Sequence, residues 1–453
     1  MKLRYKAGLM VMISGILITT SCKKTFWTDY NVNPNALAAV TPDLLLPTVE
    51  AALAYTQGGD ESRFTALLTQ QMFGANSQSQ TYYLYGLNPG VFDNLWPDLY
   101  TSTMQNDYTL IQIADKGGYN RYGGIARIIM AYQLQVAVDL WGDLPYSQAL
   151  HGNAEKAILH PTYDKALGLY DTIASLINVG TAMLQSPDAG VLVPTTQDVI
   201  YKGDEAKWIK FGHAIKGRLA LHQSKGSPQM AATALQEFAQ SFTSSADNAQ
   251  YVWGTTETSA NPWYQFYRDR PGDEDWPQSS LAASMTASND PRYGALDLDS
   301  TDAAGTAMNY YNMINSPTEL ITYDEMLFAI AEATLRSGGS LVTAQSSYQA
   351  AITANMKKLG VDPGDAAVYL TAHGTLPVGT DAAIAKIASE EYVALFLNPE
   401  VWTLWRRTGS PTLVSTTGNQ IPRRLLYPQS ELNFNADNVP SVTLYSPTLF
   451  WDK

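Results

Sequence analysis

Residues 261–276 gather the side-chain types that bind sugars and other polar ligands. Their sequence, NPWYQFYRDRPGDEDW, holds five aromatic and six charged residues in sixteen positions. Two prolines and a glycine interrupt it, so we expect an irregular loop rather than one helix or strand. Aromatic rings can stack on the apolar faces of sugar rings, and the neighbouring Arg, Asn and Asp side chains can bond hydroxyl groups. The segment therefore predicts a surface that faces a ligand or a partner.

A second aromatic cluster lies in the segment TYYLYGLNPGVFDNLW, residues 81–96. Tyrosine and tryptophan have an apolar face and a polar tip, so they suit a surface that is partly wet. We take the two clusters together as the candidate binding site. Its candidate ligand-binding residues are Tyr82, Tyr83, Trp96, Trp263, Tyr264, Tyr267, Arg268, Asp269 and Trp276. The competing interpretation is that these rings only pack the loops onto the body of the protein.

The patterns of familiar catalytic and metal sites are missing from the sequence. HExxH, GxGxxG, GxSxG and the phosphate-binding loop do not occur, and the five histidines lie nine or more positions apart. A zinc site is therefore not expected, because its ligands come in closely spaced sets. We expect a protein that is not an enzyme and that holds no metal and no cofactor.

Two runs of acidic residues could supply the carboxylate pair of a glycosidase. Asp273, Glu274 and Asp275 lie within the first aromatic segment. Glu390 and Glu391 are adjacent on an expected helix, where side chains point about 100° apart and cannot flank one bond. We expect one of these two glutamates to face solvent and the other to face an internal Arg. A glycosidase that uses Asp273 or Glu274 is the alternative enzyme interpretation, and a Ca²⁺ site in the same run is the alternative metal interpretation.

The composition describes an acidic chain that can form a large core. The 453 residues carry a net charge of −13, with a pI near 4.8 and no basic run that could follow a nucleic-acid backbone. Hydrophobic residues make up 45% and charged residues 16%, which favours a folded chain over a disordered one. Nucleic acid is therefore not an expected partner.

The N-terminus has the pattern of a secretory signal peptide. Lys2, Arg4 and Lys6 precede an apolar stretch over residues 7–20, which is shorter than the roughly 20 residues that span a bilayer. Cys22, the only cysteine, follows this stretch and is typical of the lipid-acceptor residue of a bacterial lipoprotein. Acyl chains on Cys22 would anchor the protein to a membrane. The alternative is ordinary secretory cleavage that leaves a free cysteine.

Most of the remaining sequence has the apolar spacing of helices. After a signal peptide at 1–21, we expect a polar tether at 22–40 and a first helix start at Thr41 and Pro42. Apolar residues that recur every three or four positions predict helices at 63–73, 91–114, 125–141, 163–184, 205–222, 228–242, 320–336, 344–359 and 382–405. Short strands are expected at 249–253 and 411–415.

The order of these elements predicts one mainly α-helical domain over residues 41–453. Residues 321–339 and 344–360 form the pattern of a helical hairpin of tetratricopeptide-like size. Long irregular loops, of the length that carries function, are expected at 74–90, 142–161, 185–203 and 243–280. No segment after the signal peptide is expected to span a membrane.

Several segments of the sequence together have the pattern of one known family. The most characteristic is QLQVAVDLWGDLPYSQAL (133–150). The others are DVIYKGDEAKWIKFGHAIKGRLAL (198–221), NDPRY (289–293), TYDEMLFAIAEATLR (322–336), EEYVALFLNPEVWTLWRRTGSP (390–411) and PRRLLYPQSELNFN (422–435). Together with the lipoprotein-type N-terminus, they cover nearly all of the chain. They resemble the SusD/RagB family of outer-membrane lipoproteins, in particular its SusD-like 2 branch, and residues 133–150 are close to its signature.

The resemblance implies four tetratricopeptide-like helix pairs and a lipid-anchored protein on the outer membrane of a Gram-negative cell. It also implies capture of a nutrient, typically an oligosaccharide, for a TonB-dependent, SusC-like transporter. Trp96 resembles the position where starch-binding relatives present a stacking tryptophan, whereas Trp141 belongs to the structural signature. Lys23 and Lys24 follow Cys22, where surface-exposed relatives often carry acidic residues. Cell-surface and periplasmic orientations therefore both stay open.

The sequence thus predicts a nutrient-binding lipoprotein of the outer membrane that performs no catalysis. Its expected ligand is an oligosaccharide, and its expected partner is the TonB-dependent transporter. One alternative is capture of a peptide or another non-glycan ligand by the same architecture. The other is a lipid-anchored helical scaffold whose aromatic loops bind protein.

Overall fold

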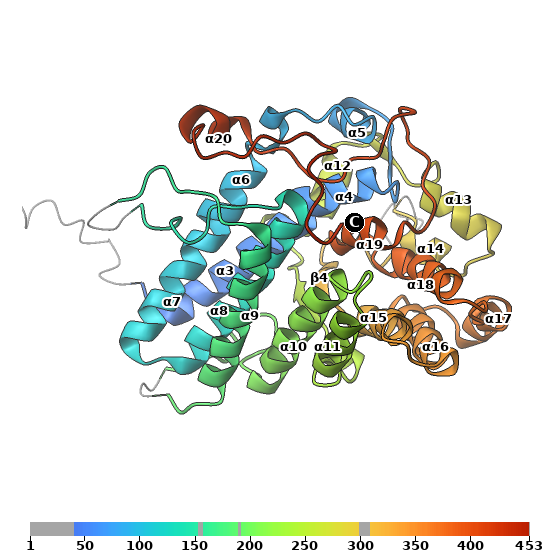
Figure 1. Cartoon of the computed structure of the whole chain (residues 1–453), viewed down its shortest axis with the longest axis horizontal. Helices are drawn as coiled ribbons and strands as arrows, with labels where there is room; N and C mark the ends of the chain where they lie inside the picture. Colours follow the sequence, from blue (N-terminus) through green and yellow to red (C-terminus); the bar gives the residue numbers. More distant parts are fainter. Residues whose placement is uncertain (1–39, 153–156, 189–191, 299–308, 453) are drawn as a thin grey trace, which may run out of the picture. The chain divides into compact units, whose positions relative to one another are not determined.

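The computed structural model describes residues 40–152, 157–188, 192–298 and 309–452 (Figure 1). The signal peptide, Cys22 and the tether expected before residue 40 lie outside the described residues. Contacts divide the chain into Met1–Thr41 and Pro42–Lys453. The following description concerns the second of these two units.

Helices make up most of the second unit, which confirms the mainly α-helical fold class. In chain order they are α3 Pro42–Thr56, α4 Ser62–Leu68, α5 Ser77–Tyr83, α6 Leu95–Pro97, α7 Gln105–Gly117, α8 Asn120–Trp141, α9 Ala166–Leu184, α10 Glu205–His222, α11 Pro228–Phe238, α12 Pro262–Asp269, α13 Ser280–Ala287, α14 Tyr293–Leu296, α15 Tyr323–Arg336, α16 Leu341–Lys358, α17 Pro363–His373, α18 Thr380–Ala394, α19 Glu400–Thr408 and α20 Gln429–Phe434. Two π-helical segments, η1 Gln57–Glu61 and η3 Asp98–Met104, lie in the first part of the unit.

Consecutive helices pack side by side through much of the unit. α7 to α11 follow one another in space, and α15 with α16 forms the predicted helical hairpin (Figure 1). α8 is the central helix, because 19 of its 22 residues are buried. An added Cβ at Gly124 of α8 would lie 2.7 Å from the carbonyl oxygen of Gly180 in α9. These two glycines therefore allow the backbones of the two helices to approach closely.

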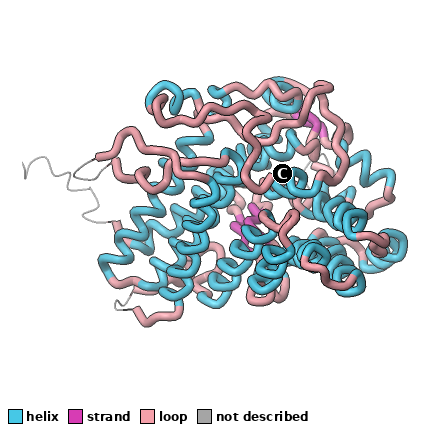
Figure 2. Tube along the Cα trace, viewed as in Figure 1, coloured by secondary structure: helices cyan, strands magenta, loops and turns pink. Residues whose placement is uncertain are grey.

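Two short antiparallel strand pairs fasten the loop-rich part to the helices. β1 (Phe73–Gly74) pairs with β3 (Glu274–Asp275), and β2 (Ala249–Val252) pairs with β4 (Pro317–Ile321). β2 matches the strand predicted at 249–253. The strand predicted at 411–415 is wrong: that segment is a loop, and the Val414 carbonyl accepts a hydrogen bond from Gln70 Nε2 at 2.6 Å instead of a strand partner. Figure 2 shows such loops gathered above the helices.

The last long helix predicted from the sequence is in fact two helices. α18 ends at Ala394 and α19 begins at Glu400. Pro399 lacks the N–H that a continuous helix needs, and it disfavours helical geometry at Asn398. The side chain of Asn398 then accepts a hydrogen bond from the Glu400 N–H at 3.0 Å, which starts α19 in a new direction.

Half of the segment 261–276 is helical, which corrects the expectation of an irregular loop. Pro262 occupies the first position of α12, where its missing N–H and fixed φ favour a helix start. Asn261 Oδ1 caps the helix by accepting from the N–H groups of Trp263 and Tyr264, at 2.8 and 3.1 Å. Because this segment is helical, its aromatic side chains point to different sides of α12 in fixed directions.

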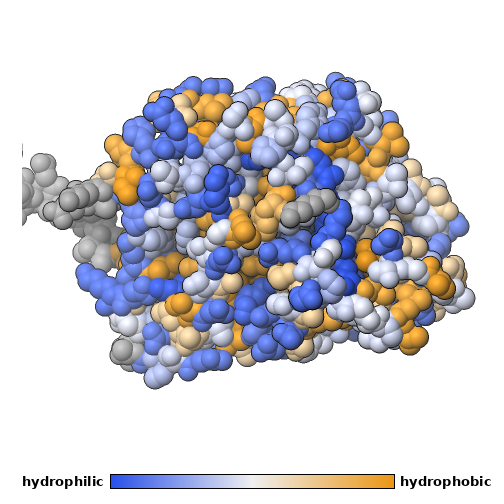
Figure 3. Space-filling model, viewed as in Figure 1, coloured by the Kyte–Doolittle hydropathy of each residue, from blue (hydrophilic) through white to orange (hydrophobic). Residues whose placement is uncertain are grey.

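Among the residues that the structure describes, one helix, α9, is long and apolar enough to cross a membrane by length and composition alone. The sequence had not indicated this helix as a candidate. α9 packs against α8 and α10, and Leu169, Ile173 and Ile177 are buried there. On the face of the described residues in Figure 3, hydrophobic residues are interspersed with hydrophilic ones.

Candidate ligand-binding site

A hollow of about 570 Å³ lies where four parts of the chain meet. These parts are the end of α3 with η1 and the start of α4, Gln78 of α5, the short segment 94–98, and α12. We call it the first hollow. Its lining includes Tyr55, Gly58, Gly59, Asp60, Arg63, Gln78, Asn94, Asp98, Trp263, Gln265, Phe266, Asp269 and Arg270. Rings, carboxylates, amides and guanidinium groups therefore face one space.

Two π-helical segments shape this hollow. Gly59 within η1 has non-helical φ and ψ values of −97° and −109°, so the backbone kinks beside the hollow. η3 begins at Asp98, on another part of the lining. π-helical turns are rare and occur often at functional sites, because they re-aim side chains out of the regular helical pattern. Here they aim Asp60 and Asp98 into the same hollow.

Guanidinium groups surround the ring of Phe266. The Arg63 guanidinium lies 4.3 Å from the ring centroid, and that of Arg270 lies 5.4 Å from it. Arg63 also donates to Asp60 Oδ1 at 2.6 Å. Arg270 makes no ion pair with any residue that the structure describes, so its donors are available to a ligand.

The acidic side of the hollow holds a carboxylate with no ion pair. Within the described part of the chain, Asp98 has neither a salt bridge nor a side-chain hydrogen bond. Partial burial and the nearby Asp60 carboxylate raise the pKa of Asp98. Behind them, burial together with Asp60 and Asp98 raises the pKa of Glu61 to about 8. The acceptors on this side are thus Asp60 and Asp98, with Glu61 mostly neutral at pH 7.

Two rings define the apolar part of the hollow. Tyr55, at the end of α3, is 50% exposed and lies on the lining. Trp263 is buried and donates its indole N–H to Ser62 Oγ at 2.5 Å, so it forms a fixed wall. The apolar face of a sugar ring could stack on Tyr55 while its hydroxyl groups reach Asp98 and Arg270.

The structure assigns several predicted site residues to the core instead. Trp96, Tyr82 and Trp276 are buried, which corrects the expectation that their rings are open for stacking. Trp96 contacts Trp141 edge-on with a centroid distance of 5.5 Å. Trp276 packs on Phe396 at 5.1 Å. Burial raises the pKa of Tyr82, and Tyr82 is not part of the lining of the first hollow.

The remaining predicted residues divide between the hollow and its surroundings. Trp263 and Asp269 line the first hollow. Tyr264, Tyr267 and Arg268 belong to α12 but are not part of the lining. Arg268 is bound to Glu257 and to Asp269, and its guanidinium lies 5.3 Å from the Tyr264 ring. Tyr83 is half-buried against Phe73, with a centroid distance of 4.9 Å.

Sequence reasoning missed most of the lining, including Tyr55, Asp60, Arg63, Asp98, Phe266 and Arg270. One signal could have indicated part of the set. The run QGGDE at 57–61 places two glycines and two acids inside a helical pattern, where glycine is costly unless the backbone needs it. Gly58 is needed, because a side chain there would collide with Thr318.

The acidic runs predicted as enzyme alternatives do not line the first hollow. Glu274 is buried in β3, where Ser79 Oγ donates to it at 3.0 Å and burial raises its pKa to about 7. Glu390 and Glu391 are both buried, so the expectation that one faces solvent is wrong. Glu390 binds Arg292 at 2.6 Å.

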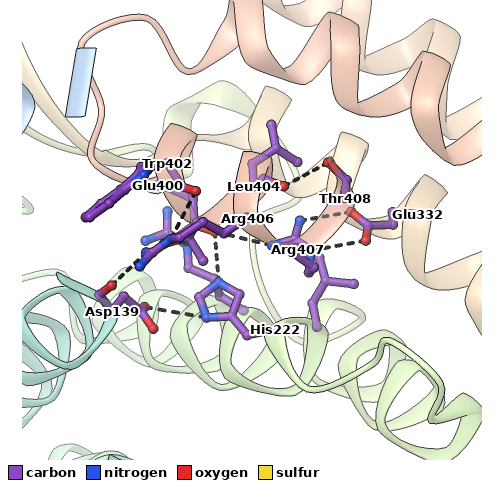
Figure 4. Close-up of polar contacts among 12 residues, drawn as sticks. Asp139, His222, Glu332, Glu400, Trp402, Leu404, Arg406, Arg407 and Thr408 are labelled. Atoms are coloured by element: carbon purple, nitrogen blue, oxygen red, sulfur yellow. Dashed lines mark hydrogen bonds and ion pairs between the residues drawn. The ribbon is translucent and has the colours of Figure 1, made fainter. Parts of the chain in front are cut away.

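A buried trio of possible metal ligands, Asp139, His222 and Glu400, lies elsewhere in the core (Figure 4). His222 Nε2 lies 2.8 Å from Glu400 Oε1, and Nδ1 lies 3.5 Å from Asp139 Oδ2. Although burial opposes it, the two carboxylates raise the pKa of His222. Nδ1 lies 2.9 Å from the Tyr170 hydroxyl, which itself donates to Asp139. An imidazolium ion fits this site, because both ring nitrogens can then donate, one to Glu400 and one to Tyr170. Arg407 lies 3.5 Å from Glu400. The positive charges of Arg407 and of the imidazolium therefore already balance the carboxylates of this cluster.

The helical frame brings rings, acids and guanidinium groups to one hollow, an arrangement that suits the binding of a ligand. The family model of SusD-like 2, described as starch-binding and associating with the outer membrane, matches residues 34–428. The chain belongs to this family. Membership confirms the family expected from the sequence, places the chain among nutrient-binding proteins associated with the outer membrane, and confirms that it is not an enzyme.

Solved structures share the fold over nearly their whole length. A SusD/RagB family protein from Bacteroides thetaiotaomicron has 23% identity and a TM-score of 0.75, over 91% of this chain and 99% of that one. A SusD homologue from Bacteroides fragilis has 20% identity and a TM-score of 0.71, over 92% and 100%. A chitin-binding SusD homologue from Flavobacterium johnsoniae has 19% identity and a TM-score of 0.69, over 90% and 98%. A comparison with curated protein sequences found no match.

Proposed function

We propose that the protein captures an oligosaccharide in the first hollow and passes it to a TonB-dependent transporter of the outer membrane. The observation that carries the proposal is the convergence of Tyr55, Asp98 and Arg270 on a space of about 570 Å³. This volume lies within the range of small-molecule binding sites. A ring with an accessible face, next to an unpaired acceptor and an unpaired donor, suits a sugar ring with its hydroxyl groups.

The lipid anchor forms part of the same proposal. Cys22 would carry the acyl chains and hold the binding domain at the membrane, next to the transporter. Acyl burial contributes roughly 0.8 kcal/mol per CH₂ group, so more than one chain gives stable anchoring. With stacking that contributes on the order of 1 kcal/mol per ring, we expect micromolar to millimolar affinity for the ligand. Such binding lets the ligand leave again for transport.

A peptide is the second candidate ligand. Asp98 and Arg270 carry opposite charges, and neither has an ion pair among the described residues. A short peptide, with an amino group and a carboxylate, could satisfy both charges at once. Glycan and peptide capture therefore differ in their dependence on these charges. Neutral sugars need hydrogen bonds only, whereas a zwitterionic peptide would lose binding steeply with added salt.

Titration calorimetry with panels of neutral oligosaccharides and short peptides tests the ligand. For an oligosaccharide, we expect Tyr55→Ala with Asp98→Ala to weaken binding at least tenfold. Tyr264→Ala is the matched control, because Tyr264 lies on α12 outside the hollow. If Tyr264→Ala weakens binding as much as the double variant, the first hollow is not the site. Peptide binding without any sugar binding would favour the second candidate.

Purification of the full-length protein from detergent-solubilised outer membrane tests the partner and the anchor. We expect a large barrel transporter to co-purify in near-equal amount, and labelled palmitate to be incorporated. Cys22→Ser should abolish the label and release the protein from the membrane fraction. If the protein purifies without any transporter, the proposed delivery step is wrong, whatever the ligand.

A further inference from the structure

A second hollow lies in the C-terminal part of the chain, and it shares no lining residue with the first. It has a volume of about 550 Å³ and is bounded by α19 and the loops that follow. Its lining includes Trp405, Leu413, Asn419, Gln420, Ile421 and Tyr445. Apolar side chains thus adjoin neutral polar ones around a space as large as the first hollow.

Trp405 brings an unused hydrogen-bond donor to the second hollow. Its ring is only 8% exposed, yet its indole N–H has no acceptor among the residues that the structure describes. The neighbouring Trp402 and Trp451 do have partners, since they donate to the Pro422 carbonyl and to Asp139 Oδ1, each at 3.2 Å. The Trp405 N–H is not among the fully buried side-chain atoms that lack a partner, so it is accessible rather than enclosed. An oxygen atom of a bound molecule could therefore accept a hydrogen bond from it.

Further neutral donors and acceptors surround this ring. The Tyr445 hydroxyl and the side-chain amides of Asn419 and Gln420 form no hydrogen bond within the described part of the chain. An amide both donates and accepts, and so does a phenol hydroxyl. A ligand rich in hydroxyl groups can therefore be matched from several sides.

The charge of the second hollow differs from that of the first. Its lining contains no carboxylate, and Arg423 is its charged member. Arg423 Nε binds Asp452 Oδ2 at 2.8 Å, and its guanidinium lies 5.2 Å from the Trp405 ring centroid. This cation is therefore already neutralised and also covers part of the indole. The hollow as a whole presents neutral groups.

The loops that form the second hollow are fixed to the rest of the domain. The Arg423 N–H donates to the Leu444 carbonyl at 2.7 Å, which joins two walls of the hollow. Thr416 Oγ1 donates to the Tyr83 carbonyl at 2.7 Å. Binding there would thus need little ordering of the chain, which favours affinity.

We propose that the second hollow is a separate binding site for a neutral saccharide unit. Apolar surface from Leu413 and Ile421 would receive a C–H face of the sugar. Trp405, Tyr445 and Gln420 would bond its hydroxyl groups. The ligand class in this inference rests on the proposed capture function, whereas the location rests on the second hollow alone. Two sites on one chain would let a long oligosaccharide bind at both, which raises avidity if its length spans them.

Fluorine NMR of the full-length protein in detergent, labelled with 5-fluorotryptophan, tests the two sites separately. Trp405 reports on the second hollow and Trp263 on the first, and Trp405→Phe and Trp263→Phe assign their signals. The probes are neutral malto-, cello- and chito-oligosaccharides. We expect a saturable shift of the Trp405 signal that survives in the Tyr55→Ala/Asp98→Ala variant. Gln420→Ala with Tyr445→Ala should weaken this response at least tenfold, whereas Gln429→Ala on α20 should leave it unchanged.

The outcomes distinguish this inference from the proposed function. A saccharide that shifts the Trp263 signal and leaves the Trp405 signal unmoved would overturn the second site alone. So would a Trp405 shift that disappears in the first-hollow variant. A Trp405 shift without any Trp263 shift would support the second site and count against the first. If every signal stays still with all probes, both proposals fail.

Discussion

Three carboxyl groups lie close together beside the first hollow. Glu61 is only 3% exposed, while Asp60 and Asp98 reach the hollow itself. Burial and the two neighbouring charges raise the pKa of Glu61 to about 8. At neutral pH Glu61 is therefore mostly protonated, and the hollow has one negative charge fewer than the sequence indicates. This difference has a measurable effect on stability.

The effect should be visible in the pH dependence of unfolding. The pKa of Glu61 is near its ordinary value of 4.5 in the unfolded chain and about 8 in the fold. Between these values the folded state binds the extra proton, so the free energy of unfolding decreases as pH rises. Glu61→Gln removes this dependence. From pH 5 to pH 8.5 we expect the variant to gain on the order of 3 kcal/mol relative to the parent, measured by urea unfolding. A constant difference would contradict the assigned pKa.

Single residues also show why the site was only partly predictable. Trp96 and Tyr55 both belong to segments with helical patterns, but Trp96 packs against Trp141 and Tyr427 whereas Tyr55 faces the first hollow. Residue type and spacing say that a ring suits an interface. They do not say whether that interface is with solvent or with another helix, because the neighbouring element comes from a distant part of the chain.

At the scale of elements, α12 carries one wall of the first hollow, and its start depends on Asn261. Besides capping the helix, Asn261 donates from Nδ2 to the Ser316 carbonyl at 3.0 Å. The two prolines and the glycine of residues 261–276 indicate a loop, although Asn followed by Pro is also a helix start. Asn before Pro fits both, and the choice depends on the contacts of Trp263 with the core, which the sequence does not display.

Asn261→Ala should weaken both the helix start and the ligand site. Loss of the cap alone costs about 1 kcal/mol of stability, and loss of a buried hydrogen bond costs about another 1 kcal/mol. We expect a total near 2 kcal/mol in urea unfolding, with weaker oligosaccharide binding because Trp263 and Phe266 shift. Asn261→Ser is the control, since serine keeps the cap oxygen and should recover about half of the loss. Equal stability of the alanine variant and the parent would show that α12 starts without the cap.

The contact between α8 and α9 offers a second test at this scale. Gly180→Ala would place a methyl group 2.8 Å from the Gly124 carbonyl oxygen, so we expect a loss of about 1–3 kcal/mol from overpacking. Gly168→Ala in the same helix meets nothing within 4 Å. This control should gain up to about 1 kcal/mol, because alanine favours helix over glycine. Thermal or urea unfolding measures both, and similar effects of the two changes would contradict the close approach.

At the scale of the whole molecule, the fold was more predictable than the site. Helical spacing indicated α8, α10 and the α15–α16 hairpin because apolar residues recur in each at three- and four-residue intervals. The first hollow instead joins residues 55–63, 94–98 and 262–270, which no local pattern connects. The resemblance to a family indicated the architecture and directed attention to Trp96, but the open ring is Tyr55.

Buried ion pairs tie these distant helices together. Arg407 of α19 binds Glu332 of α15 at 2.8 Å, and His222 of α10 binds Glu400 of α19 (Figure 4). Burial acts to raise the pKa of Glu332, but the guanidinium groups of Arg407 and Arg336 hold this pKa at about 2. Glu332 is therefore charged at every physiological pH. Loss of Arg407 would leave this charge buried with Arg336 as its remaining partner.

Arg407→Met should accordingly be among the most destabilising changes in the chain. Removing one partner of a buried ion pair costs about 3–5 kcal/mol, because the other charge remains desolvated. Arg268→Met is the matched control: its ion pairs with Glu257 and Asp269 lie at the surface, where such pairs contribute about 0–1 kcal/mol. Urea unfolding of the two variants compares them directly. If both lose less than about 1 kcal/mol, the link between α15 and α19 rests on apolar packing alone, and Arg407 is dispensable to the fold.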